Sequence, residues 1–235
     1  MVIAGLQKMT LLDYPGKVAC TVFLQGCNFR CPFCHNRDLL DNAPAAVSRE
    51  ELLAFLQKRR GLLDAVCISG GEPTLQADLE PLIREIKALG YAVKLDTNGN
   101  RPAVLKRLVS EQLLDYVAMD VKNSPARYGE TVGIGSFDLS AVEESLAFLL
   151  GGAVDYELRT TVVAELHDEQ SVRDIGEWLA RLSPDTPAKR FFLQAYVDRD
   201  SVLCEGLHAP SDETLDILRE TLAPYVAEAH IRGKS

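Results

Sequence analysis

Short apolar segments alternate along the chain with longer segments in which apolar residues recur at helical spacing. The apolar segments are rich in β-branched and aromatic residues, which predicts strands, whereas a spacing of three and four residues predicts amphipathic helices. Strands are expected at residues 18–26, 65–73 (ending in a glycine turn), 92–99, 116–122, 155–163 and 191–196, with an edge strand at 229–232. Helices are expected at residues 48–60, 79–89, 102–109, 139–150, 170–182 and from about 214.

Strands that alternate with helices form parallel βαβ units with right-handed crossovers. About six such units are too few to close an eight-stranded barrel, but they suit a partial barrel or an open sheet. We expect a single α/β domain over residues 1–235, because the chain has no linker, internal repeat or low-complexity segment. In either architecture, the functional residues gather at the carboxyl ends of the strands.

The composition narrows the class of protein. With 47% hydrophobic and 25% charged residues, the 235-residue chain resembles an ordinary globular protein rather than a disordered one. Its 34 acidic and 25 basic side chains leave a net charge of -9, which disfavours nucleic acid as a partner. Gln7, Lys8 and Asp13 interrupt the apolar residues at the N-terminus, and no later run is long enough to span a membrane. We therefore expect a cytoplasmic protein with no membrane partner.

Three of the six cysteines lie in one short loop after the strand predicted at residues 18–26. Cys27, Cys31 and Cys34 have the spacing C-x3-C-x2-C, which brings three thiolates to one strand end. A structural Cys3His zinc site is one interpretation, but His35 directly follows Cys34 and both side chains would have to bend onto one ion. Thiolates also favour iron–sulfur clusters, and three of them can hold a 4Fe-4S cluster that keeps one iron open. An open iron is a site for a substrate or a cofactor.

The segment CNFRCPFCHN resembles the signature of radical S-adenosylmethionine (SAM) enzymes, and the resemblance extends over nearly the whole chain. In that family the second strand ends in a GGEP-like motif, and here Gly70-Gly71-Glu72-Pro73 follows the strand that begins at Ala65. The resemblance implies a partial (βα)6 barrel, a 4Fe-4S cluster on the three cysteines, and SAM as the second cofactor. It also implies that Gly70, Gly71 and Glu72 hold the methionine amino group, since glycines let main chain approach a ligand closely.

A closer resemblance is to the activating enzymes of glycyl-radical proteins. It rests on the sequences HNRD at 35–38, DTNG at 96–99 and DVK at 120–122. The opening segment LLDYPGK at 11–17 is similar to that of anaerobic ribonucleoside-triphosphate reductase activating proteins, which implies that this reductase is the partner. The resemblance also implies a flavodoxin or a ferredoxin-type protein as the electron donor.

The same resemblance assigns further side chains to the cofactor, and Lys122 to the catalytic site as well. They are Phe33 near the adenine, Asn36, Asp96, Asp120, Lys122 and Arg159, and the resemblance also allows Asp96 and Asp120 to share a monovalent cation. The residues themselves support part of this, because Asp120 and Lys122 share one face of a strand end, where unpaired charges are costly. A structural ion pair between them is the alternative. For Arg159, the alternative to a cofactor contact is an exposed position on a strand. For Phe33, the alternative is simple packing of the loop.

The other cysteines and three histidines receive no role in the site. Cys20 and Cys67 lie in apolar strands and are predicted to be core residues, whereas Cys204 lies in a polar loop. The histidines have no metal partners near them in the sequence; they are His167, His208 and His230.

The sequence therefore predicts an enzyme that cleaves SAM reductively and generates a glycyl radical on a partner. A radical SAM enzyme acting on a small molecule, such as a 7-carboxy-7-deazaguanine synthase, is one alternative with the same motifs. A pyruvate formate-lyase activating enzyme is another, weakened because Gln194 stands where some of those enzymes have histidine. A non-enzymatic zinc or iron–sulfur protein is the third, and it would need neither the GGEP motif nor the charges at the strand ends.

Overall fold

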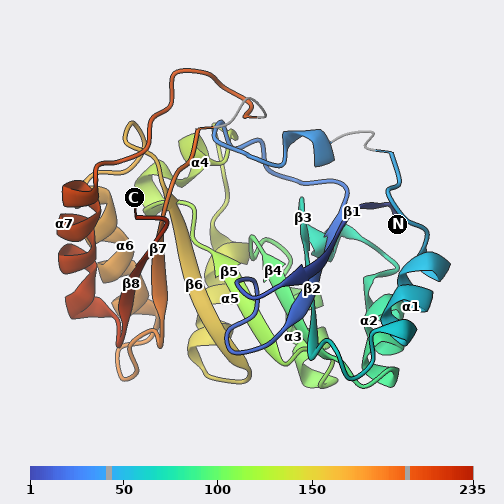
Figure 1. Ribbon diagram of the computed structural model, residues 1–235. Helices are drawn as coiled ribbons and strands as arrows, with labels where there is room; N and C mark the ends of the chain where they lie inside the picture. Colours follow the sequence, from blue (N-terminus) through green and yellow to red (C-terminus); the bar gives the residue numbers. More distant parts are fainter. Residues whose placement is uncertain (41–43, 199–201, 235) are drawn as a thin grey trace. The chain divides into compact units, whose positions relative to one another are not determined.

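The computed structural model describes residues 1–40, 44–198 and 202–234 (Figure 1). The chain forms two compact units. The first unit comprises Met1–Asn28, Asn36–Thr97 and Ala103–Ala118, and the second comprises Phe29–His35, Asn98–Pro102 and Met119–Ser235.

Parallel strands form the centre of the first unit (Figure 1). Strand β2 (Ala19–Leu24) pairs in parallel with β3 (Ala65–Gly70), which pairs in parallel with β4 (Ala92–Thr97). The register places Thr21, Cys67 and Lys94 side by side, so these three residues face the same side of the sheet. Strand β5 (Tyr116–Asp120) begins in this unit and ends in the second.

A strand that the sequence did not predict precedes this group. Strand β1 (Ile3–Thr10) pairs antiparallel with β2, with register shifts near both of its ends. Its three consecutive exposed residues from Gln7 to Met9 break the alternation of buried and exposed positions that a regular half-buried strand shows. The alternation of apolar and polar residues therefore does not predict this strand from the sequence.

The helices of this unit follow the predicted positions. They are α1 (Arg49–Lys58), α2 (Leu79–Ala88) and α3 (Pro102–Ser110), with short 3-10 turns at Arg37–Leu39 and Pro73–Leu75. The predicted capping box is present at α1, where the Ser48 hydroxyl accepts a hydrogen bond from the Glu51 amide and the Glu51 carboxylate accepts one from the Ser48 amide. Gly61 follows the helix with φ of 77°, a conformation that ends helices at little cost for glycine.

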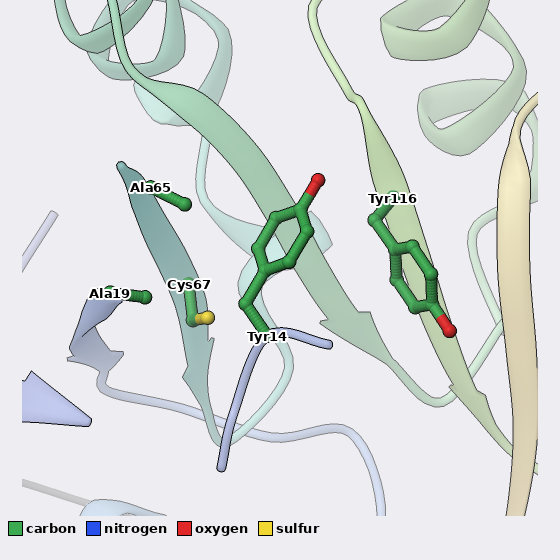
Figure 2. Packing of buried hydrophobic residues seen from close by; sticks show 5 residues of the cluster. All are labelled: Tyr14, Ala19, Ala65, Cys67 and Tyr116. Carbon is green, nitrogen blue, oxygen red and sulfur yellow. The ribbon is translucent and has the colours of Figure 1, made fainter. Parts of the chain in front are cut away.

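A buried cluster of Tyr14, Ala19, Ala65, Cys67 and Tyr116 includes the first residues of β2, β3 and β5 (Figure 2). In Figure 2 the Tyr14 ring lies between Cys67 and the Tyr116 ring, and the two ring centroids are 5.5 Å apart. Cys67 and Cys20 are fully buried, which confirms their predicted place in the core. Burial raises the pKa of both thiols, for Cys20 to about 12, so both stay protonated and unreactive at neutral pH.

The second unit repeats the alternation of strands and helices. Its strands β6 (Asp155–Val162), β7 (Phe191–Ala195) and β8 (Ala229–Arg232) pair in parallel in that order, so the predicted edge strand is confirmed. Its helices are α4 (Tyr128–Thr131), α5 (Ser140–Leu150), α6 (Glu169–Leu182) and α7 (Asp212–Leu222), with 3-10 turns at Pro125–Arg127 and Ala223–Tyr225. Helix α6 packs against α5 and α7, and α7 packs against β7 and β8 (Figure 1).

In the part of the chain that the structure describes, no helix is both long enough and apolar enough to cross a membrane.

The capping box at α1 gives a first testable prediction. Ser48→Ala removes the side-chain acceptor for the Glu51 amide and should lower the free energy of unfolding by about 1 kcal/mol. Ser48→Asp keeps an acceptor at the same position and serves as the matched control. Urea denaturation followed by circular dichroism measures both variants, and equal midpoints for Ser48→Ala and the wild type would contradict the assignment.

Candidate functional site

The turn after β3 lies directly against the end of β2 within the first unit. The Gly71 amide donates to the Leu24 carbonyl at 2.9 Å, and the Glu72 amide donates to the Gly26 carbonyl at 2.7 Å. Gly70 has φ of 124°, and a Cβ atom there would collide with the Leu24 backbone. A Cβ atom on Gly71 would collide with the Gly26 carbonyl and approach the Cys27 Cβ to 3.2 Å. Both glycines are therefore needed for the turn to fit beside the first cysteine.

The sequence interpretation of these glycines considered only the room they leave for a ligand. The structure adds a second reason, because Gly71 also makes room for the backbone that carries Cys27. Asn36 joins the same turn, since its side-chain amide donates to the Gly70 carbonyl at 3.0 Å. The predicted residues Asn36, Gly70 and Gly71 are thus brought together.

Glu72 is fully buried and holds the elements around it in place. Its Oε1 accepts hydrogen bonds from the Thr74 amide at 3.1 Å, from the Thr74 hydroxyl, and from the Thr97 hydroxyl at 2.8 Å. These bonds tie the turn after β3 to the end of β4. The predicted contact of Glu72 with a methionine amino group stays a prediction.

Asp96 lies near the carboxyl end of β4 and pairs with a buried lysine that sequence reasoning did not single out. The Lys94 ammonium lies 2.7 Å from the Asp96 carboxylate, and the Lys94 residue is only 1% exposed. An ion this deeply buried is costly without a partner, so the pair fixes the orientation of Asp96. The spacing of two residues along a strand is the sequence signal for this pair, as it is for Asp120 and Lys122.

In the second unit, Asp120 accepts hydrogen bonds from two cationic side chains. Lys122 Nζ lies 2.9 Å from Oδ2, and Arg159 Nε lies 2.9 Å from Oδ1. The predicted proximity of Asp120 and Lys122 is confirmed, and Arg159 is part of the same group rather than an exposed strand residue.

The charges of Asp120, Lys122 and Arg159 act on one another and determine the protonation of Asp120 and Lys122. Burial disfavours the Asp120 carboxylate, but the charges of Arg159 and Lys122 and their hydrogen bonds outweigh burial and lower its pKa to about 2. Burial likewise disfavours the Lys122 ammonium, yet the Asp120 charge outweighs it and raises the Lys122 pKa above its usual value. Because the Asp120 pKa is depressed, the stabilisation it provides is present above about pH 4 and is lost as the pH falls towards 2.

His167, to which the sequence assigned no role, holds the backbone of Lys122. Its ring is buried, and burial lowers its pKa, so the ring is neutral at pH 7. The Val163 amide donates to Nδ1 at 3.1 Å, which leaves the ring proton on Nε2, and Nε2 donates to the Lys122 carbonyl at 2.9 Å. A histidine 45 residues away in the chain carries no sequence signal for this contact.

The later part of the cysteine loop belongs to the second unit. The Cys34 amide donates to the Cys31 carbonyl at 3.0 Å, and Phe33 between them is buried. The His35 ring stacks on Tyr196 with centroids 5.3 Å apart, and its Nε2 lies 2.6 Å from the Val197 carbonyl. The Cys204 amide donates to the Pro32 carbonyl at 2.9 Å, although the Cys204 residue is exposed. The segment around Tyr196 thus supports the loop that carries Cys31 and Cys34.

The donor chemistry of the loop fits a 4Fe-4S cluster. Within the ranges 1–40, 44–198 and 202–234, no three His, Cys, Asp or Glu side chains are grouped so that they could hold one metal ion. Each cysteine of a 4Fe-4S cluster binds a different iron, so the thiolates need not converge on a single point. Cys31 and Cys34 lie in one tight turn, and the tight fit of Gly71 against Cys27 fixes the backbone of the first cysteine.

Gly71→Ala tests the fit at Cys27. The added methyl group must displace the Gly26–Cys27 backbone, so the variant should bind less iron after anaerobic reconstitution than the wild type. Gly135→Ala is the control, because a Cβ atom there meets no other atom within 4 Å. Iron and sulfide are counted in both purified variants, and full occupancy in Gly71→Ala would show that the backbone can yield without losing the ligand.

Comparisons with known proteins agree with this geometry. The family model of the radical SAM superfamily matches residues 21–170. A provisionally named glycyl-radical enzyme activating enzyme of Methanocaldococcus jannaschii is 36% identical over 182 residues, which is 74% of each chain. The 7-carboxy-7-deazaguanine synthase of Hyperthermus butylicus is 32% identical over 191 residues, which is 77% of this chain and 69% of that protein.

The fold is also shared with solved structures. The crystal structure of Streptococcus suis SuiB superposes with a TM-score of 0.70 over 91% of this chain and 48% of that chain, at 13% sequence identity. The predicted fold class, an α/β partial barrel of the radical SAM type, is confirmed. The cysteine spacing, the GGEP turn, the family match and the fold lead to one conclusion: the chain belongs to the radical SAM superfamily.

Proposed function

We propose that this radical SAM enzyme activates a glycyl-radical enzyme by placing a radical on one of its glycines. The observation that carries the proposal is the turn in which Gly70 fits against Leu24 and Gly71 fits against Gly26 and Cys27, because it joins the motif for SAM to the start of the cluster loop. The similarity to the Methanocaldococcus jannaschii activating enzyme supports a protein substrate. We further propose that both units act as one radical SAM domain over residues 1–235.

The cysteines Cys27, Cys31 and Cys34 would hold a 4Fe-4S cluster, and the residues at the strand ends would hold SAM. When bound, the two groups supply reductive cleavage of a carbon–sulfur bond and abstraction of a hydrogen atom, with methionine and 5'-deoxyadenosine as products. Orientation and exclusion of water are the contributions of the protein.

Each group of side chains has a task that suits its chemistry. Asn36, Gly70, Gly71 and Glu72 would present the turn after β3 to the methionine moiety, and Phe33 would pack near the adenine. Asp96 would accept hydrogen bonds from the ribose, with Lys94 keeping it oriented. In the second unit, Lys122 and Arg159 carry one more positive charge than Asp120 neutralises, which suits the carboxylate of the methionine moiety.

A monovalent cation is not needed for charge balance at either predicted carboxylate. Asp96 has Lys94 as a partner within the first unit, and Asp120 has Lys122 and Arg159 within the second. The shared monovalent cation stays a prediction that these ion pairs do not require.

For the partner we propose an anaerobic ribonucleoside-triphosphate reductase, on the similarity of the segment LLDYPGK to the activators of that enzyme. A flavodoxin or a ferredoxin-type protein would supply the electron. The relative in Hyperthermus butylicus favours a second candidate, a radical SAM enzyme that acts on a small purine-like molecule.

The test is direct generation of the radical. The reduced protein, SAM and an anaerobic ribonucleotide reductase should together give a glycyl-radical doublet in electron paramagnetic resonance (EPR) and a matching amount of 5'-deoxyadenosine. Cleavage of SAM without a partner radical, across several glycyl-radical enzymes, would overturn the proposal and favour the small-molecule candidate.

Cysteine variants check that the activity depends on the cluster. Cys27→Ala, Cys31→Ala and Cys34→Ala should each lose the cluster and the radical, because each removes an iron ligand. Cys204→Ala should keep both, since the Cys204 hydrogen bond to the loop comes from its backbone amide, which the substitution leaves in place. Iron counts and the EPR doublet are measured together, and loss of the cluster in Cys204→Ala would contradict the ligand set.

A further inference from the structure

We propose that Arg232 and Glu157 are positioning residues that keep the Arg159 guanidinium hydrogen-bonded to Asp120. The proposal rests on the role of Arg159 in binding SAM, which is part of the proposed function. Neither Arg232 nor Glu157 belongs to a motif of the sequence, and both lie in the second unit.

Arg232 is the last residue of β8, and its guanidinium binds Glu157 in a bidentate manner. Nη1 lies 2.9 Å from Oε1 of Glu157, and Nη2 lies 2.9 Å from Oε2. The guanidinium also stacks over the Phe192 ring, 3.5 Å from its centroid. A planar fork held by two hydrogen bonds and a ring has a fixed orientation, which a lysine in the same place would not have.

Glu157 is a deeply buried carboxylate that faces two cations. It is 1% exposed and lies two residues before Arg159 on β6, so both side chains point to the same face of the sheet. Arg159 Nη1 is 4.0 Å from Glu157 Oε1, which is beyond hydrogen-bond distance, whereas Arg159 Nε is 2.9 Å from Asp120. Arg159 therefore lies between two carboxylates and is bonded to Asp120.

Removal of Arg232 would change which of the two carboxylates Arg159 binds. Loss of a bidentate partner is strongly unfavourable for a buried carboxylate, and Arg159 is a cation whose Nη1 lies only 4.0 Å from Glu157. We expect Arg159 to turn towards Glu157 and to give up its hydrogen bond to Asp120. The orientation of a residue in the SAM site thus depends on the edge strand at the carboxyl end of the chain.

The net charge of the group leads to the same expectation. Three cations, Arg232, Arg159 and Lys122, oppose two carboxylates, Glu157 and Asp120, so the group has a net charge of +1. Loss of Arg232 makes the group neutral and removes the excess that would attract an anionic ligand. Replacing Glu157 by glutamine in addition restores the net charge of +1 and removes the competitor for Arg159.

The experiment measures SAM affinity in four variants of the reconstituted protein. They are Arg232→Met, the double variant Glu157→Gln/Arg232→Met, Arg159→Met, and the control Arg219→Met, which removes an arginine paired with the neighbouring Glu220 on α7. SAM is titrated against the EPR signal of the reduced cluster, and iron content and thermal unfolding are recorded for every variant.

We expect Arg232→Met to weaken SAM binding about tenfold with iron content unchanged, as is typical when a residue supporting a direct ligand is lost. The double variant should recover most of that loss, and Arg219→Met should bind as the wild type does. Glu157→Gln also removes the buried charge whose partner Arg232→Met deletes, so a merely structural role would be rescued in thermal unfolding as well. A loss and recovery of SAM affinity at unchanged iron content is the result that such a role would not give.

Three results separate failure of this inference from failure of the proposed function. Wild-type affinity in Arg159→Met would mean that Arg159 is not a SAM contact and would remove the basis of the inference. Weak binding in Arg159→Met with wild-type binding in Arg232→Met would overturn the inference alone. Equal weakening in Arg232→Met and the double variant would contradict the competition between Glu157 and Asp120.

Discussion

The close packing of the turn after β3 against the end of β2 is the contact on which the candidate site of the first unit depends. It is made of two main-chain hydrogen bonds, from Gly71 to Leu24 and from Glu72 to Gly26, and it leaves no space for a side chain at either glycine. The same contact fixes the backbone just before Cys27 and the turn that we propose for binding SAM. A protein that must bring an iron ligand and a cofactor loop to one strand end therefore has a physical reason for two glycines in a row.

Ion pairs at the strand ends hold the predicted site residues Asp96 and Asp120 in place. Lys94 orients Asp96 in the first unit, whereas Lys122 and Arg159 orient Asp120 in the second. These ions are partly or fully buried, so each pair needs its partner to avoid an uncompensated charge. Polar groups that are fixed before a ligand arrives need little rearrangement when it binds, which is how enzymes gain from preorganised dipoles and charges.

The sequence predicted the elements well wherever the spacing of apolar residues was regular. The capping box at Ser48 and the edge strand at 229–232 follow from local patterns, and both are confirmed. Strand β1 was missed because three consecutive exposed residues hide its alternation. Lys94 was missed as a partner of Asp96, although the same spacing of two residues was recognised at Asp120 and Lys122.

Contacts between distant strands could not be predicted from one sequence. Glu157 and Arg232 are 75 residues apart, and only the parallel pairing of β6, β7 and β8 brings the two strands near each other. His167 likewise reaches the Lys122 carbonyl only because the loop after β6 folds back onto the end of β5. The cysteine loop and the GGEP turn were found because their chemistry depends on short spacings, whereas the supporting residues depend on the fold.

We propose that Cys27, Cys31 and Cys34 would hold a 4Fe-4S cluster and leave one of its irons for SAM. Mössbauer spectroscopy of the protein reconstituted with iron-57 tests it most directly, because the method resolves the coordination of individual irons. The account predicts that adding SAM changes the signal of one iron site and leaves the other three unchanged. A spectrum in which SAM alters none of the irons would contradict it.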